Sequence, residues 1–74
     1  MDYGTYIGRD GVTRHYEVIE YTEPPYWVAA RIQIGTDAPT EKLFSSMSGA
    51  VRYIMRDICE QMNTSLMVSV HMRG

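Results

Sequence analysis

The clearest hydrophobic pattern in the chain lies between residues 47 and 62. Apolar side chains recur there every three or four positions, the spacing that places them along one side of an α-helix. They are Met47, Val51, Ile54, Met55, Ile58 and Met62. The pattern predicts a helix over residues 48–62 with Val51 and Ile58 at the centre of its buried side. Ser48 is the expected N-cap, and Ser46 is the alternative.

The segments before this helix alternate in the manner of β-strands. In residues 26–36, the even-numbered side chains are predicted to face the core, and the odd-numbered ones are predicted to face outward. The first set is Tyr26, Val28, Ala30, Ile32 and Ile34; the second is Trp27, Ala29, Arg31 and Gln33. Residues 12–21 predict a second long strand, preceded by an Asp10-Gly11 hairpin turn and followed by a turn at Pro24-Pro25.

Two further segments complete the expected sheet. Residues 40–45 predict a short strand, with an early turn of the helix as the alternative, and residues 66–72 predict a closing strand. Hairpin-connected strands, one helix and a returning strand imply an α+β fold. We expect a single domain over residues 1–74, with a mostly antiparallel sheet of three to five strands and one helix packed on one face.

Composition and charge narrow the possible functions. The 74 residues carry a formal charge of −2, which disfavours a simple binder of the phosphate backbone. One cysteine, a polar start and the lack of a long apolar run predict a cytoplasmic protein. We find no catalytic, metal or nucleotide-binding motif, and therefore expect a non-enzymatic protein without a cofactor. Pairing of Cys59 with His71 is disfavoured because the C-terminal end of a helix destabilises a thiolate, so Cys59 is expected to be buried or half-buried.

The outer face of the sheet is the first candidate binding surface. If Tyr16 and Val18 point to the core, the outward positions combine aromatic, aliphatic and charged side chains. They are Glu17, Ile19, Tyr21, Trp27, Ala29, Arg31, Met67 and His71. This composition is typical of the centre of a protein–protein interface. The alternatives are a reversed register, or a face covered by the N-terminal strand.

Two other surfaces are candidates. The predicted solvent side of the helix carries Tyr53, Arg56 and Glu60, which indicate either a second binding surface or an ordinary solvated face. Glu17, Glu20 and Glu23 form an acidic run around Tyr21. Such a run can attract a basic, nucleic-acid-binding partner, or it can protect the exposed edge of a strand from unwanted pairing.

The order of elements resembles that of small phage-encoded proteins that block host defences, anti-CRISPR proteins among them. The resemblance lies in the small size, the hairpin strands at residues 14–21 and 26–34, the single helix at 48–62 and the closing strand at 66–72. It implies an inhibitor without a cofactor or an active site, which covers a surface of a host nucleic-acid-processing complex.

We therefore expect a protein-binding inhibitor. The candidate partner-binding residues are Tyr21, Trp27, Arg31, Tyr53, Arg56, Glu17 and Glu20. One alternative is a structural homodimer that joins the outer faces or edge strands. Another is a nucleic-acid-binding module that uses Arg14, Arg31, Arg52 and Arg56 with exposed aromatic rings.

Overall fold

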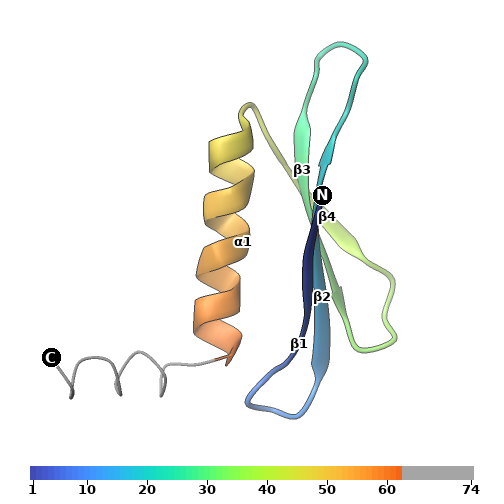
Figure 1. Cartoon of the computed structure of the whole chain (residues 1–74). Coiled ribbons are helices and arrows are strands. Elements are labelled where there is room, and N and C mark those ends of the chain that lie inside the picture. Colours follow the sequence, from blue (N-terminus) through green and yellow to red (C-terminus); the bar gives the residue numbers. More distant parts are fainter. Residues whose placement is uncertain (63–74) are drawn as a thin grey trace, which may run out of the picture.

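Four strands and one helix follow one another in the computed structural model, which describes residues 1–62. They are β1 (Asp2–Ile7), β2 (Thr13–Glu20), β3 (Val28–Ile34), β4 (Thr40–Phe44) and α1 (Met47–Met62). The strands form one antiparallel sheet in the order β1-β2-β3-β4. The helix packs on one face of this sheet and contacts every strand (Figure 1). The predicted α+β arrangement and the short strand at residues 40–45 are confirmed, whereas the expected strand at 66–72 lies outside the described residues.

The two predicted turns join the strands as expected. At the β1–β2 turn, Gly11 adopts a φ of 79°, which glycine reaches without steric cost, and its N–H donates to the Gly8 carbonyl over 2.9 Å. At the β2–β3 turn, the N–H of Tyr26 donates to the Glu23 carbonyl over 2.8 Å. The N–H of Tyr21 also donates to the carbonyl of Trp27 over 3.0 Å, so pairing continues to the start of the turn.

The buried face of the sheet follows the predicted alternation at its centre. Tyr16 lies opposite Ile32, and Val18 lies opposite Ala30. The buried core consists of Tyr16, Val18, Val28, Ala30, Ile32, Ala50 and Ile54. Tyr26 and Ile34 were also predicted for this face, but both are exposed. Tyr26 lies before β3 in the β2–β3 turn, where its positive φ of 59° interrupts the strand alternation, and Ile34 is the last residue of β3.

The helix is rotated about its axis relative to the prediction. Ala50 and Ile54 are fully buried at the centre of the contact, while Val51 and Ile58 are only partly buried at its side. Met55, which was predicted to be buried, is 48% exposed. The small Ala50 side chain allows the helix to approach the sheet closely. A prediction based on the spacing of large apolar residues does not take alanine into account. The prediction of a buried Cys59 is also wrong, since that residue is exposed.

The start of the helix corrects the expected N-cap. The hydroxyl oxygen of Ser46 accepts the backbone N–H of Gly49 over 3.2 Å, so Ser46 caps the helix and Ser48 does not. A Cβ atom at Gly49 would lie only 3.2 Å from Cδ2 of Phe44. Glycine at this position therefore allows the end of β4 to pack closely against the first turn of α1.

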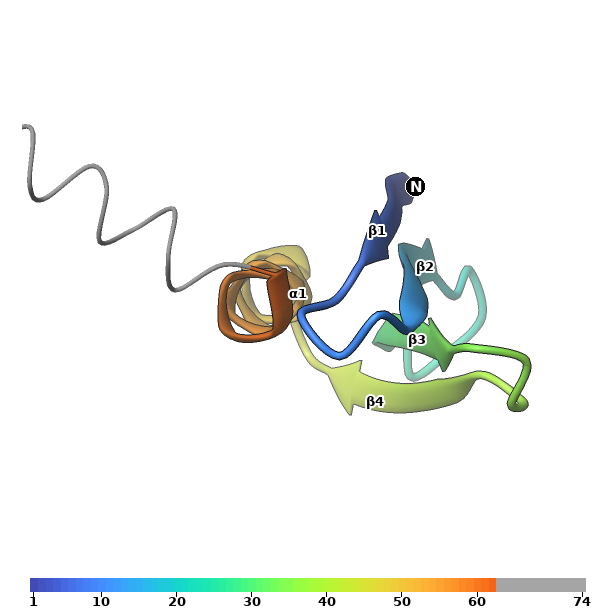
Figure 2. The same cartoon turned by 90° about the horizontal axis from the view of Figure 1, so that it is seen from below.

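The opposite face of the sheet has no cover within residues 1–62. Figure 2 shows the sheet curving from β1 to β4 around α1, with the helix as the only described element on that side. β1 extends the sheet as an edge strand beside β2 and does not fold over the outer face. The edge position of β1 excludes burial of the outer face by the N-terminal strand. The burial of Tyr16 and Val18 in the core with Ala50 and Ile54 of the helix excludes the reversed register.

Candidate binding surfaces

The open face of the sheet carries an apolar patch formed by Ile19, Tyr21, Trp27 and Leu43. Tyr21, Trp27 and Leu43 are 42%, 39% and 50% exposed, and Ile19 is half-buried. Ala29 lies between Ile19 and Leu43 in the register and has no exposed surface. The side chains of Ile19 and Leu43 cover Ala29 from both sides, so the apolar surface continues from β2 across β3 to β4. We refer to these four residues as the open-face patch.

A charged network borders the open-face patch. The guanidinium of Arg31 binds Glu41 on β4 through its Nε, over 2.9 Å, and through its Nη2. Its Nη1 lies 3.3 Å from Oε1 of Glu17 on β2. The hydroxyl of Tyr21 donates to the other oxygen of Glu41 over 2.8 Å. Two carboxylates thus share one guanidinium, so the network has an excess of negative charge and holds the Tyr21 ring in place.

The network also shifts the pKa values of Glu41 and Tyr21. Hydrogen bonds from Arg31 and then from Tyr21 lower the pKa of Glu41 below its usual range, because both donors stabilise the charged carboxylate. The same contact raises the pKa of Tyr21, since the neighbouring carboxylate disfavours a phenolate. At neutral pH, Glu41 is therefore ionised and Tyr21 is neutral.

We expect the network to stabilise the fold at neutral pH and to lose this effect in acid. A carboxyl with a lowered folded-state pKa stabilises the fold above its unfolded pKa of about 4.3, and the effect disappears as the pH falls through the folded value. Glu41→Gln should therefore lower the urea midpoint at pH 7, and the difference from the unchanged protein should shrink towards pH 3.

The matched control is Asp10→Asn, which removes a different carboxylate with a lowered pKa. The pKa of Asp10 is lowered mainly by a two-point hydrogen bond from Arg14 over 2.9 and 3.0 Å. In Glu41→Gln this second source of acid sensitivity remains, whereas Asp10→Asn removes it and leaves the network intact. A difference between Glu41→Gln and the unchanged protein that stays constant from pH 7 to pH 3 would contradict the role assigned to Glu41.

The predicted acidic run does not form one surface. Glu17 lies on the open face in contact with Arg31. Glu20 is paired with Val28 and lies on the other side of β2, the side that faces the helix. Glu20 and Glu23 are nevertheless both exposed, at the end of β2 and in the turn that follows. The run therefore contributes negative charge around the end of the sheet but only Glu17 to the open face itself.

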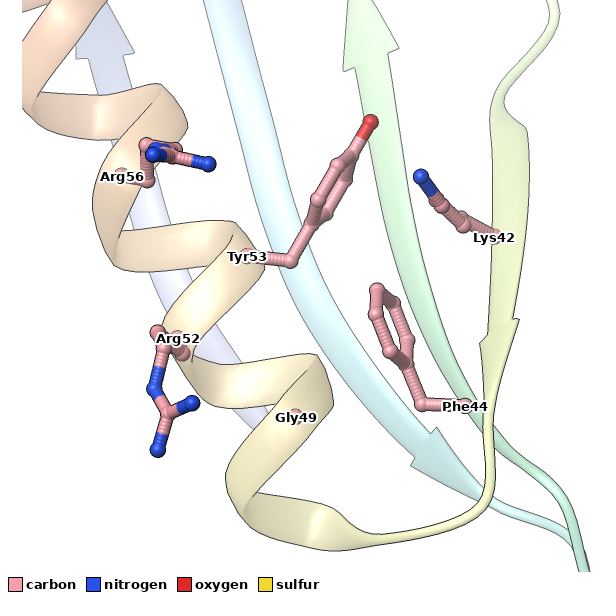
Figure 3. A pocket seen from close by; sticks show the side chains of 6 residues that line it. All are labelled: Lys42, Phe44, Gly49, Arg52, Tyr53 and Arg56. Carbon is pink, nitrogen blue, oxygen red and sulfur yellow. The ribbon is translucent and has the colours of Figure 1, made fainter.

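Two of the helix residues predicted to face solvent, Tyr53 and Arg56, line a groove, whereas the third, Glu60, is exposed outside it. Tyr53 is half-buried, because the rotation of the helix turns its ring against Phe44 with a centroid distance of 5.4 Å. The prediction of a solvent-facing Tyr53 is therefore only partly right, while Arg56 is exposed as predicted. These residues form one wall of a groove between α1 and β4, lined by Lys42, Phe44, Gly49, Arg52, Tyr53 and Arg56 (Figure 3).

The four arginines of the nucleic-acid-binding alternative are not brought together. Arg14 is buried on the helix-facing side of β2 and paired with Asp10. Arg31 lies on the open face between two glutamates. Only Arg52 and Arg56 share a surface. Met67 and His71, which were expected to extend the open face, lie outside the described residues.

Three surface residues could not be selected from the sequence. Glu41 and Leu43 of β4 extend the open face, and Lys42 lies between them on the helix-facing side. Alternation along residues 40–44 separates these side chains into two sets. Which set faces the helix depends on the pairing of β4 with β3, and the sequence pattern of the short strand does not determine that pairing.

Comparisons with known proteins add no functional assignment. No protein-family model matches the chain, and neither a curated protein nor a solved structure is significantly similar to it. In the described part of the chain, no group of three His, Cys, Asp or Glu side chains is placed to hold a metal ion. The helix of residues 47–62 lacks the length and apolar character needed to cross a membrane.

Proposed function

We propose that this protein is a non-enzymatic binding protein that uses the open face of its sheet to cover a basic surface of a partner protein. One observation carries the proposal: the open-face patch lies beside the network of Glu17, Arg31 and Glu41. An exposed tryptophan and tyrosine supply the anchors typical of interfaces. The excess of carboxylates favours a positively charged partner.

The proposed partner is a host nucleic-acid-processing complex. Proteins of that class present basic surfaces to bind phosphate backbones, and an acidic surface with an apolar centre can occupy such a site. The small α+β fold agrees with the resemblance to phage anti-CRISPR proteins, which implies inhibition by occlusion. Tyr21 and Trp27 would act as anchors, with Arg31 holding the two glutamates in position.

Affinity capture tests the proposal. The tagged full chain is incubated with a nuclease-treated bacterial lysate, in parallel with Trp27→Ala and with Met55→Ala, which truncates an exposed apolar residue on the helix. We expect one nucleic-acid-processing complex to be retained by the unchanged protein and by Met55→Ala, to be lost with Trp27→Ala, and to be displaced by added nucleic acid.

Two results would contradict the proposal. Retention of the complex by all three proteins would show that the open face is not the contact. Recovery of only the tagged protein itself would instead favour the homodimer, and a melting temperature that rises with protein concentration would support the homodimer further.

A further inference from the structure

The groove between β4 and α1 has the dimensions of a small-molecule site. Its volume is about 540 Å³, within the range of roughly 300–1,000 Å³ typical of ligand pockets. Phe44 and Tyr53 form its apolar part, with their rings packed against each other at an interplanar angle of 48°. Figure 3 shows Tyr53 reaching from the helix towards β4, and Lys42 and Phe44 reaching from β4 towards the helix.

The groove also collects positive charge. Lys42 approaches from β4, and Arg52 and Arg56 lie one helical turn apart on α1. None of these three takes part in the ion pairs found within residues 1–62, where Arg14 and Arg31 are both paired with carboxylates. Even Glu60, four residues after Arg56, does not pair with it in the described chain. The Nζ of Lys42 instead lies 4.9 Å from the centroid of the Tyr53 ring.

A concentration of like charges in a protein of net charge −2 favours an anionic ligand. Lys42 comes from the strand wall and the two arginines come from the helix wall, with the Arg52 guanidinium directed away from Lys42 in Figure 3. A ligand that meets all three groups would therefore need several acceptor oxygens spread along the groove. A phosphate group provides them, and the planar fork of arginine suits phosphate oxygens well. A single carboxylate has only two oxygens in one plane and would meet fewer of the three groups.

The surroundings of the groove favour a short ligand over a nucleic-acid strand. A strand that continued beyond the groove would require further unpaired cations along its path, but Arg14 and Arg31 are both neutralised by carboxylates. The rings of Phe44 and Tyr53 cover each other, and Lys42 lies over Tyr53, so they do not offer a row of free stacking faces. They do offer apolar surface for the sugar or base of one nucleotide.

We propose that the groove lined by Lys42, Phe44, Arg52, Tyr53 and Arg56 binds a nucleotide, with its phosphates held by the three cationic side chains. The site is on the face of the sheet opposite the open-face patch, so the inference does not depend on the proposed partner. Arg52 and Arg56 bind phosphate oxygens from the helix, Lys42 supplies a point charge from the strand, and the aromatic pair contacts the nucleoside.

Titration of the isotope-labelled full chain with ADP, followed by amide NMR signals and by calorimetry, tests the inference. We expect shifts concentrated at residues 42–44 and 49–56, and saturable binding that weakens with salt. Arg52→Gln and Arg56→Gln should each weaken binding roughly tenfold, the loss expected for a charge-assisted hydrogen bond. Arg9→Gln removes the same charge from the β1–β2 turn and should change binding less than twofold.

Three further probes decide the identity of the ligand. Adenosine should bind far more weakly than ADP, because it lacks the phosphates, and inorganic phosphate should bind more weakly because it lacks the nucleoside. Equal binding of adenosine and ADP, or of inorganic phosphate and ADP, would overturn the assignment. A thymidine oligonucleotide that binds at the same residues but much more tightly than ADP would replace the nucleotide with a nucleic-acid strand. Absence of shifts in the groove at millimolar ADP would reject the site altogether.

Discussion

Tyr16→Ala is expected to unfold the protein. Tyr16 is completely buried and is the largest such side chain in the described core. Replacing a buried aromatic residue with alanine costs about 3–5 kcal/mol, because apolar burial is lost and a cavity remains. The total stability of a domain of this size rarely exceeds roughly 3–5 kcal/mol. We therefore expect loss of the cooperative thermal transition by circular dichroism.

A second variant separates the ring of Tyr16 from its hydroxyl. The hydroxyl donates to Oδ2 of Asp57 over 2.7 Å and so joins β2 to α1. Burial, followed by this hydrogen bond, raises the pKa of Tyr16, so the donor stays protonated. Tyr16→Phe should cost about 1.5–3 kcal/mol, the range for hydrogen bonds to charged groups, and should leave a folded protein.

Tyr26→Ala is the matched control for both variants. Tyr26 is another tyrosine, but it is 61% exposed in the β2–β3 turn. Its truncation should change the stability by less than about 0.5 kcal/mol. A Tyr16→Ala protein that melts at the same temperature as Tyr26→Ala would show that Tyr16 does not hold the sheet and helix together.

Trp27→Ala is expected to weaken partner binding by more than about 1 kcal/mol, or roughly fivefold, without unfolding the domain. The side chain lies in the open-face patch and is already 39% exposed, so its truncation leaves the core intact. In a complex it would be buried against the partner, and the loss would appear mainly as faster dissociation. Surface plasmon resonance with the captured complex measures this rate.

The effect of Trp27→Ala on partner binding requires a control variant and a check that the domain remains folded. Met55→Ala removes an apolar side chain of similar exposure from the helix and should leave the dissociation rate unchanged. Tyr21→Ala should weaken binding in the same way as Trp27→Ala, and it also frees one oxygen of Glu41. If Trp27→Ala and Tyr21→Ala both lose the folded state, these residues belong to the core and the open face is not the binding surface.

The central part of the fold could be predicted from local pattern alone. The Asp10-Gly11 turn follows from the backbone preferences of two residues, and the alternation at Val28, Ala30 and Ile32 follows from the period of a strand. These features depend on neighbours in the sequence. For the same reason, the choice of Trp27 and Tyr21 as outward-facing residues was correct once Tyr16 and Val18 were assigned to the core.

The groove could not be predicted in this way. Arg56 and Tyr53 were chosen as a helix surface, but their relation to Lys42 and Phe44 requires the packing of α1 beside β4. That packing rests on Ala50, which carries only a methyl group, and on Gly49, which has no side chain. Both allow close approach, and a search for large apolar residues does not detect them. The rotation they permit brings Tyr53 against Phe44 and turns Met55 outward.

The sequence by itself determined the fold class, the main strands, the turns and the approximate limits of the helix, because each depends on interactions within a few residues. Only the tertiary structure decided how charges are shared. Arg14 and Arg31 carry the same charge as Arg52 and Arg56, yet the first two are neutralised by carboxylates and the last two line a groove. The Arg14 pair is local, because Asp10 lies only four residues away. The other differences arise from strand register, which places Arg31 beside Glu17 and Glu41, and from helix rotation, which places Arg52 and Arg56 across from Lys42.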